Sequence, residues 1–344
     1  MRAAVYNAPF DISVESRPDP VIQSPREAIV RVTSTCVCGS DLWYYRGESK
    51  RKGGGPIGHE FLGVIEEIGA DVSALKVGDF VIAPFMWSDG TCPHCLHGVT
   101  SSCVHGGFWA IGTDGGQGEY VRVPEADGTL VVVPGGAPDA ALLPSLLTLS
   151  DVMGTGHHAA VSAGVVAGST VAVVGDGAVG LCGVLAARRL GAGRIIALSR
   201  NPERQAIARA FGATDIVSSR GDDAVAEVRD LTDGVGVDAT LECVGTAQAF
   251  TTAFAVARPG SRVGFVGVPH GVEFPLQAAF ANNVGLSGGL APVRAYLPAL
   301  LDDVLNGSID PGLVFDYEFD FENIADAYAA MDGRRAIKAI AHLS

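Results

Sequence analysis

The sequence has few aromatic residues and little positive charge. Aromatic residues make up 7% of the 344-residue chain, and 24 lysines and arginines stand against 38 aspartates and glutamates, which leaves a net charge of −14. A chain this acidic has no basic surface to neutralise phosphates, so we expect no nucleic-acid partner. The acidity favours solubility.

Long apolar segments are also missing. Glycine and charged residues interrupt every apolar stretch before it reaches the roughly 18 residues of a membrane span, so no membrane association is expected. The first residues, Met1–Tyr6, have neither the apolar core nor the cleavage site of a secretion signal. We therefore expect a cytoplasmic protein.

Cysteines are few as well, seven in all, and two of them stand in Cys92-Pro93-His94-Cys95. Without an export signal, such a pair indicates metal ligands rather than a disulfide. Cys36, Cys182 and Cys243 are expected to be small buried apolar residues.

What the chain has in abundance is glycine, at 45 residues, over a length that suits two domains. In the first 150 or so residues, turn residues separate short β-type runs at Ala28–Val32, Gly63–Ile68 and Gly78–Ile82, which predicts an antiparallel, barrel-like domain. From Ser169 onward, apolar strands alternate with helical stretches, which predicts an α/β domain with a doubly wound parallel sheet. The expected strands are Thr170–Val174, Arg194–Leu198, Ala239–Glu242 and Arg262–Val266, and the expected helices are Val179–Leu190, Glu203–Phe211 and Tyr296–Leu305.

A nucleotide-binding fingerprint follows the first of these strands. Gly175, Gly177 and Gly180, with Ala178 and Val179 between them, stand between strand and helix. In this context the glycines permit a tight turn, close approach of a pyrophosphate to the backbone, and packing of helix on strand. An ordinary glycine-rich turn is the weaker alternative.

The end of the second strand indicates which dinucleotide binds. NAD-binding proteins carry an acidic residue there, roughly 20 residues after the glycines, on the ribose 2′-hydroxyl. This chain has Ser199 and Arg200 instead, with Arg204 one turn on, and arginine can pair with a 2′-phosphate. We therefore expect NADP(H) in preference to NAD(H). If Arg200 only stacks on adenine or lies in solvent, specificity is mixed.

Two sets of residues could hold zinc. Cys38, His59 and Asp151, with Glu60 beside the histidine, supply the thiolate, imidazole and carboxylate donors of a reactive site with an open position. Asp41 is a candidate to hold the His59 ring. The second set lies in a polar loop and consists of Asp89, Cys92, Cys95 and Cys103. A zinc ion bound by these four residues would cross-link the loop. His94, His97 and His105 are alternatives to Asp89, and a redox pair of cysteines is the rival interpretation.

Together these segments resemble the zinc-dependent medium-chain alcohol dehydrogenases (medium-chain dehydrogenase/reductase superfamily), in particular the NADP-dependent secondary-alcohol dehydrogenases. The resemblance rests on the glycine fingerprint, the cysteine loop, and the segments Gly58–Val64, Val77–Val81 and Gly116–Tyr120. It implies a GroES-like catalytic domain, residues 1–152 with 292–344, into which a Rossmann domain, residues 153–291, is inserted. It also implies an active site in the cleft between the domains and a homodimer or homotetramer.

The resemblance further assigns roles to single residues. Ser40 relays a proton, and the backbone of Val266, Gly267 and Val268 holds the carboxamide of the nicotinamide. Val244 is a further cofactor-binding residue, and Lys338 lies near the cofactor phosphates. Asp89 replaces the first cysteine of the usual structural-zinc loop, and Trp43 replaces the relay histidine of many members. Trp43, Met86 and Trp109 are candidate substrate contacts, or simply packing residues.

The implied activity is zinc-dependent hydride transfer between NADP(H) and an alcohol, ketone or aldehyde, with a secondary alcohol as the expected substrate. A sugar or polyol dehydrogenase of the same family is the main alternative. A non-catalytic NADPH-binding protein on the same scaffold is an alternative of another class.

Overall fold

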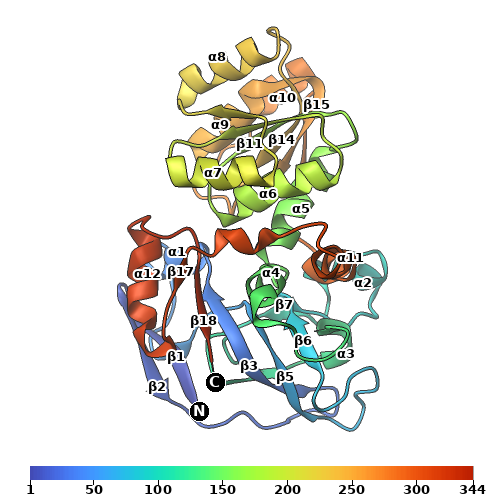
Figure 1. Ribbon diagram of the computed structural model, residues 1–344, viewed down its shortest axis with the longest axis vertical. Coiled ribbons are helices and arrows are strands. Elements are labelled where there is room, and N and C mark those ends of the chain that lie inside the picture. The colour runs from blue at the N-terminus through green and yellow to red at the C-terminus, as the bar shows by residue number, and fades with distance from the viewer. Residues whose placement is uncertain (344) are drawn as a thin grey trace. The chain divides into compact units, whose positions relative to one another are not determined.

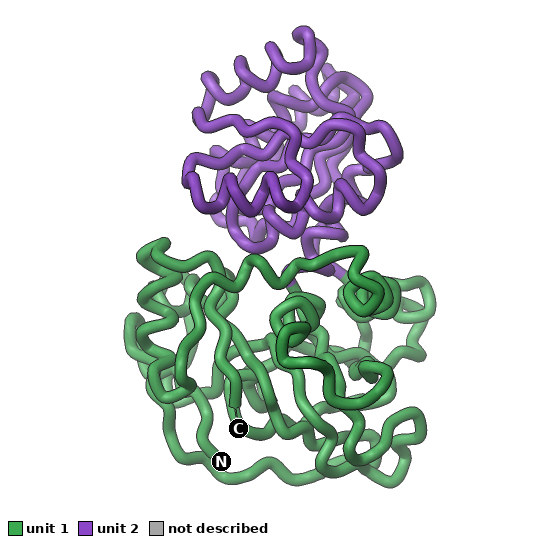
Figure 2. The backbone as a smooth tube through the Cα atoms, viewed as in Figure 1, with its two compact units in different colours: residues 1–151, 292–344 green, residues 152–291 purple. Residues whose placement is uncertain are grey.

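The computed structural model describes residues 1–343, which form two compact units (Figures 1 and 2). The first unit contains residues 1–151 and the chain from Pro292 onward, and the second contains Val152–Ala291. Sequence analysis placed the first boundary one residue later, after residue 152. Among the described residues, no helix combines the length and the apolar character needed to cross a membrane.

The first unit is built on antiparallel sheets. Its largest sheet has seven strands in the order β10-β6-β5-β3-β18-β17, with β9 also paired to β3, and β17 and β18 form its parallel pair. A three-stranded sheet, β2-β1-β4, and the hairpin β7-β8 complete the unit. The strands are β1 (Arg2–Ala8), β2 (Asp11–Ser16), β3 (Ala28–Val37), β4 (Gly55–Pro56), β5 (Phe61–Ile68), β6 (Phe80–Ala83), β7 (Met86–Trp87), β8 (Gly107–Phe108), β9 (Tyr120–Val123), β10 (Val131–Val132), β17 (Tyr317–Glu318) and β18 (Ala339–His342).

The last segment of the chain returns to this unit. Strand β18 pairs antiparallel with β3, with Ala339 opposite Val37 and Ile340 opposite Cys36. This register brings the residue before β18, Lys338, to the end of β3. The helices of the unit are α1 (Asp41–Tyr45), α2 (Pro93–Leu96), α3 (Ala126–Thr129), α4 (Leu143–Thr148), α11 (Val293–Leu305) and α12 (Ile324–Asp332), with 3-10 turns at Thr100–Ser102, Ala140–Leu142, Pro311–Val314 and Phe321–Asn323.

The second unit is a six-stranded parallel sheet in the order β13-β12-β11-β14-β15-β16, which confirms the predicted doubly wound fold. Helix α6 contacts α5 and α7, and α8 contacts α9 (Figure 1). The strands are β11 (Thr170–Val174), β12 (Arg194–Leu198), β13 (Asp215–Val217), β14 (Val237–Glu242), β15 (Ala257–Phe265) and β16 (Gly285–Gly288). The helices are α5 (Val152–Ala163), α6 (Ala178–Arg189), α7 (Pro202–Phe211), α8 (Gly221–Leu231), α9 (Ala247–Val256) and α10 (Leu276–Asn282).

Local sequence explains why α7 begins and ends where it does. The Asn201 side chain accepts hydrogen bonds from the backbone N–H groups of Glu203 and Arg204, and Pro202 occupies the first helical position. Gly212 closes the helix with φ 113°, a left-handed conformation that glycine adopts without strain. This capping places Arg204 in the first turn of α7, six residues after the end of β12.

Candidate functional site

The four residues of the first predicted metal set converge in the first unit. Cys38 follows β3, His59 and Glu60 precede β5, and Asp151 follows α4. One donor atom from each lies within 4.8 Å of the others. Because β3 and β5 are adjacent strands, the end of one and the start of the other deliver three of the four donors to one edge of the sheet.

The spacing of the donors fits a tetrahedral ion. Cys38 Sγ lies 3.6 Å from Asp151 Oδ2, and His59 Nε2 lies 3.4 Å from the same oxygen. Zinc bonds of about 2.0–2.3 Å place two tetrahedral ligands about 3.3–3.8 Å apart. One thiolate, one imidazole and one carboxylate are also the mixed donor set that zinc accepts. The residues present therefore fit the ion.

The electrostatics of this cluster favour a bound cation. Burial raises the pKa of the Cys38 thiol, and the nearby Glu60 carboxylate raises it further. Burial likewise raises the pKa of Glu60, although Lys338 opposes that effect. Burial lowers the pKa of His59, but Asp41 and Cys38 outweigh it, and the net shift is well upward. Crowded acidic groups out of water need a counter-charge, which a divalent cation supplies.

Two neighbours orient the histidine. His59 Nδ1 lies 3.3 Å from Asp41 Oδ1, as expected for a carboxylate that holds the ring and turns Nε2 toward the other donors. The second oxygen of Asp41 accepts a hydrogen bond from the Cys38 backbone N–H at 3.1 Å. Asp41 thus contacts two of the predicted zinc ligands, His59 and Cys38, at once. Ser40 Oγ lies 3.5 Å from His59 Nε2, next to the position a bound ion would take.

Lys338 lies beneath this cluster. Its Nζ donates to Glu60 Oε1 at 2.6 Å and to the Val37 carbonyl at 3.3 Å, and its side chain is 1% exposed. The other Glu60 oxygen, Oε2, is buried without a hydrogen-bond partner among the described residues. The ammonium is therefore committed to Glu60, and the expected contact of Lys338 with cofactor phosphates stays a prediction. Nothing local in the sequence signals this pair, since its partners are 278 residues apart.

Aromatic side chains border the histidine. The ring of Phe85 meets that of His59 edge-on at 6.4 Å between centroids, and Phe108 packs on Phe85 at 6.2 Å. Sequence reasoning missed both phenylalanines. Trp109, predicted to be either a substrate contact or a packing residue, packs in the core, where it is 3% exposed and its Nε1 donates to the Pro84 carbonyl. Trp43 and Met86 are half-buried.

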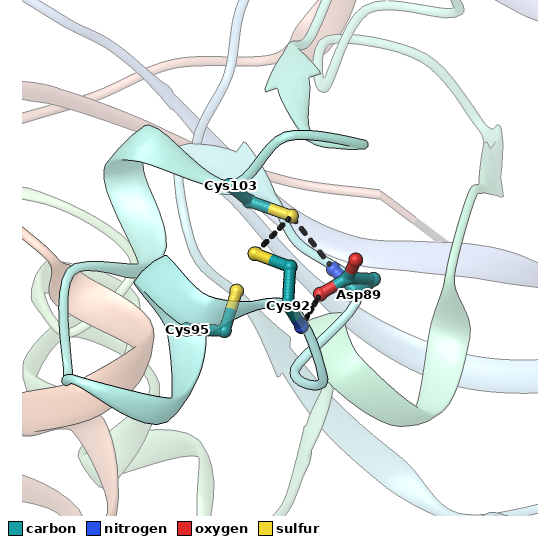
Figure 3. Close-up of side chains that lie close together, drawn as sticks. All are labelled: Asp89, Cys92, Cys95 and Cys103. Carbon is teal, nitrogen blue, oxygen red and sulfur yellow. Dashed lines mark hydrogen bonds between the residues drawn. The ribbon is translucent and has the colours of Figure 1, made fainter.

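The second metal set gathers in the loop that contains α2 (Figure 3). Donor atoms of Asp89, Cys92, Cys95 and Cys103 lie within 4.8 Å of one another. The sulfurs of Cys92 and Cys103 are 3.9 Å apart, close to the roughly 3.8 Å separation of two thiolates on tetrahedral zinc. No thioredoxin-like unit surrounds the pair among the described residues, so the geometry favours a structural metal over redox chemistry.

The hydrogen bonds of Asp89 distinguish it from the histidines offered as alternatives. Asp89 Oδ1 accepts from the backbone N–H groups of Thr91 and Cys92 at 2.8 and 2.9 Å, and Oδ2 lies 2.7 Å from His105 Nδ1. His94 and His97 instead contact the carbonyls of Ser102 and Pro93. His105 is therefore placed to orient Asp89 rather than to replace it.

The loop also prepares one thiol for a metal. The backbone N–H of Cys95 near the Cys92 sulfur lowers the pKa of Cys92 to about 7, so the thiolate is accessible at neutral pH. Burial of the Asp89 carboxyl opposes its ionisation, but N–H donation from Cys92 and contact with His105 prevail, and its pKa lies well below the usual range. Burial raises the pKa of Cys95 and of Cys103. Metal binding would have to displace the protons of these two thiols.

In the second unit, each glycine of the fingerprint has its own structural reason. Gly175 has φ 120° at the turn after β11. A side chain on Gly180 would place its Cβ 2.0 Å from the Gly175 carbonyl oxygen, so the start of α6 could not pack there. At Gly177 an added Cβ would meet no protein atom within 4 Å, which leaves open space beside the N-terminus of α6, formed by Ala178 and Val179. A pyrophosphate fits these three requirements.

The remaining predicted cofactor residues follow the carboxyl ends of parallel strands. Val244 follows β14, and Val266, Gly267 and Val268 follow β15, next to the point where the strand order reverses between β11 and β14. Such a reversal is where open α/β sheets bind ligands. Val244 and Val268 are 39% and 48% exposed, so their surfaces are open to a ligand.

Sequence reasoning missed Glu242, which joins these loops. Its Oε1 accepts from the backbone N–H groups of Val244 and Gly245 at 2.9 and 2.8 Å. Its carbonyl oxygen accepts from the N–H groups of Val266 and Gly267. A buried carboxylate at the end of an apolar strand was the available signal for a local structural role.

The residues expected to contact the adenosine ribose and its 2′-phosphate lie together near the end of β12. Ser199 is 4% exposed, and Arg200 beside it is exposed. Arg204 is buried, and its guanidinium donates to the Asp176 carbonyl at 3.1 Å and lies 3.5 Å from Asp176 Oδ1. Ser199 Oγ donates to Asp176 Oδ2 at 3.0 Å. Sequence reasoning gave no role to Asp176, the residue between the first two glycines.

Comparison with known proteins identifies both units. Residues 24–135 match the alcohol dehydrogenase GroES-like domain, and residues 178–306 match the zinc-binding dehydrogenase domain. The zinc-type alcohol dehydrogenase B of Aspergillus flavus is 33% identical over 350 residues, covering 99% of this chain and 81% of that protein.

Other similar proteins span the whole chain. The sorbitol dehydrogenase of Bacillus subtilis is 31% identical over 334 residues, 95% of this chain and 92% of that protein. The solved structure of alcohol dehydrogenase TADH from Thermus sp. ATN1 superposes with a TM-score of 0.91 at 32% identity, covering 100% of both chains.

Proposed function

Since the chain belongs to the zinc-dependent medium-chain alcohol dehydrogenase family, an oxidoreductase family acting on alcohols, we propose that it transfers hydride between NADP(H) and a secondary alcohol or its ketone. The observation that carries this proposal is the convergence of Cys38, His59 and Asp151 at separations of a tetrahedral zinc site. A protein that only bound NADPH would have no use for this donor set.

The residues of the first unit have three roles in the proposed reaction: binding of zinc, orientation of the histidine, and proton transfer. Cys38, His59 and Asp151 would hold zinc, which when bound supplies a Lewis acid that polarises the substrate oxygen. Asp41 keeps His59 Nδ1 engaged, so that Nε2 stays directed at the donor cluster. Ser40 Oγ, 3.5 Å from that nitrogen, accepts the hydroxyl proton of the alcohol and passes it to water or the cofactor ribose.

The aromatic border supports an apolar substrate. Phe85 meets His59 edge-on and Phe108 packs on Phe85, while Trp43, where many relatives carry a relay histidine, is half-buried. These rings offer no hydrogen bonds to a polyol chain, with the indole N–H as the exception. The similarity to a sorbitol dehydrogenase favours the polyol alternative. Steady-state rates with 2-alkanols, aldehydes and polyols, matched in chain length, separate these two substrate classes.

The preference for NADP(H) is supported by Ser199 and Arg200 at the end of β12. A short hydroxyl leaves room for a 2′-phosphate, and the exposed guanidinium of Arg200 can form charge-assisted hydrogen bonds to it.

None of the seven cysteines forms a disulfide in the structure, which suits a reducing compartment such as the cytoplasm.

A homo-oligomer is supported by the free edge of the parallel sheet. Strand β16 is the last strand of that sheet, and its residues are partly or fully exposed. Leu276 and Phe280, in the helix α10 that precedes β16 in the chain, and Leu290, just after the strand, are 69%, 85% and 52% exposed. An edge strand with one free side and exposed apolar side chains near it in the chain is suited to pairing with the same strand of a second copy around a two-fold axis.

The test of the proposed activity uses metal content and turnover together. Cys38→Ser and His59→Ala should each remove one equivalent of zinc and lower kcat for ketone reduction at least 1000-fold, because the Lewis acid is lost, while NADPH still binds. Cys182→Ala, in α6 of the other unit, is the matched control for loss of a buried thiol and should keep both zinc and turnover. Unchanged turnover in both site variants would exclude the zinc assignment.

A further inference from the structure

The glycine loop carries a carboxylate at the place where the ribose is recognised. Asp176 lies in the turn between Gly175 and Gly177, yet its Oδ2 accepts a hydrogen bond from Ser199 Oγ at 3.0 Å. Ser199 is the first residue after β12, the position from which NAD-binding proteins present their acidic residue to the ribose 2′-hydroxyl. An acid is therefore present at this end of the strand, although it comes from a different segment.

The Asp176 side chain also determines which of the two nearby arginines, Arg200 or Arg204, is left to bind the 2′-phosphate of NADP(H). The Arg204 guanidinium donates to the Asp176 backbone carbonyl and lies 3.5 Å from Asp176 Oδ1, with only 8% of its side chain exposed. Its charge is therefore largely balanced by Asp176. Arg200 is exposed, which leaves it as the cation of this group that can meet a 2′-phosphate from solvent.

We propose that Asp176 is a specificity-determining residue for the dinucleotide. Its carboxylate accepts a hydrogen bond from the adenosine 2′-hydroxyl of NAD(H) and repels the 2′-phosphate of NADP(H), in opposition to Arg200. This inference rests on the proposed dinucleotide site. It makes the preference for NADP(H) a modest one, set by the balance between one carboxylate and one guanidinium, and it keeps NAD(H) usable.

The side chain is placed for both effects. Asp176 is half-buried, with 17% of its side chain exposed, so one face of the carboxylate reaches solvent while the other holds Ser199 and Arg204. A phosphate at the end of β12 carries close to two negative charges, and a fixed carboxylate within hydrogen-bond reach of Ser199 weakens its binding. A neutral 2′-hydroxyl meets no such repulsion and gains an acceptor.

The experiment measures dissociation constants by fluorescence titration of NADPH and NADH, so the readout does not depend on turnover. Asp176→Asn keeps the size and an acceptor for Ser199 but removes the charge. It should tighten NADPH binding about tenfold, which corresponds to about 1.4 kcal/mol, and weaken NADH binding severalfold. Arg200→Ala should change the ratio of the two constants in the opposite direction.

Asp238→Asn is the matched control. The Asp238 carboxylate likewise accepts one hydrogen bond, from the Thr170 backbone N–H, and pairs with an arginine, Arg258. It lies at the start of β14, at the amino ends of the parallel strands, whereas Asp176 follows the carboxyl end of β11. Its neutralisation should leave the ratio of the constants unchanged. If Asp176→Asn proves unstable, Asp176→Ser provides a second neutral side chain for the same measurement.

The outcomes separate this inference from the proposed function. A ratio of NADPH to NADH constants that is the same in Asp176→Asn as in the wild type, with both nucleotides bound, would overturn the role of Asp176 and leave the dinucleotide site intact. Failure of the wild-type protein to bind either nucleotide would overturn the proposed function itself, and this inference with it.

Discussion

At the scale of single residues, the buried pair of Glu60 and Lys338 contributes directly to the stability of the first unit. Glu60 is fully buried and Lys338 is 1% exposed, with 2.6 Å between Oε1 and Nζ. Two charges without access to water stabilise each other only while both are present. The lysine therefore holds one Glu60 oxygen, and the other oxygen remains available to the donor cluster.

This pairing leads to a stability prediction. Lys338→Met should lower the free energy of unfolding by about 3–5 kcal/mol, because it leaves the Glu60 charge buried without its partner. The measurement is denaturant-induced unfolding followed by circular dichroism.

Lys52→Met removes an exposed lysine from the same unit and is the control. The double variant Glu60→Gln with Lys338→Met should recover much of the lost stability, since no unpaired charge remains. A Lys338→Met protein as stable as the Lys52→Met control would contradict a stabilising role for the pair.

At the scale of elements, the cysteine loop is the segment that depends most on a metal. Helix α2 has four residues and the 3-10 turn after it has three, so neither is long enough to be stable on its own. Zinc bound by Asp89, Cys92, Cys95 and Cys103 would supply the missing cross-link.

We therefore expect two zinc ions per chain by elemental analysis of the purified protein. Cys95→Ser should reduce the count to one and make the loop susceptible to proteolysis, while the zinc of the other cluster stays. Asp89→Cys would complete a set of four thiolates and should retain the metal longer against a chelator. A wild-type protein with a single zinc would show that the loop is held by its hydrogen bonds alone.

At the scale of the whole molecule, we propose that copies of the chain associate through the free edge of β16. Phe280, in the helix α10 that precedes this strand, is 85% exposed, so Phe280→Lys should not disturb the fold of the unit. The variant should dissociate the proposed oligomer to monomers, because a charge would be buried at the interface. Light scattering after size exclusion provides the measurement. Phe10→Lys, at another exposed aromatic residue, should leave the oligomer intact, and a wild-type monomer would refute the proposal.

The parallel sheet was the part of the fold most readily predicted. The expected strands Thr170–Val174 and Arg194–Leu198 coincide with β11 and β12, because each is a short apolar run bounded by glycine or polar residues. The expected starts of α6 and α7 differ from the observed starts by one residue. Helix α8 was not predicted, since its apolar side is interrupted by acidic residues and buries only Ala224 and Val228 completely.

The sequence by itself determined the chemistry that this protein can offer. The donor types at Cys38, His59 and Asp151 and the three glycines of the fingerprint depend on residue identity and local geometry, so they could be read from the chain. Only the tertiary structure decided which charged and polar side chains pair with one another around these groups. It pairs Lys338 with Glu60, through the register of β18 on β3, and sets Asp176 against Ser199 at adjacent strand ends. Such pairings arise where distant segments meet, and a local sequence pattern does not encode them.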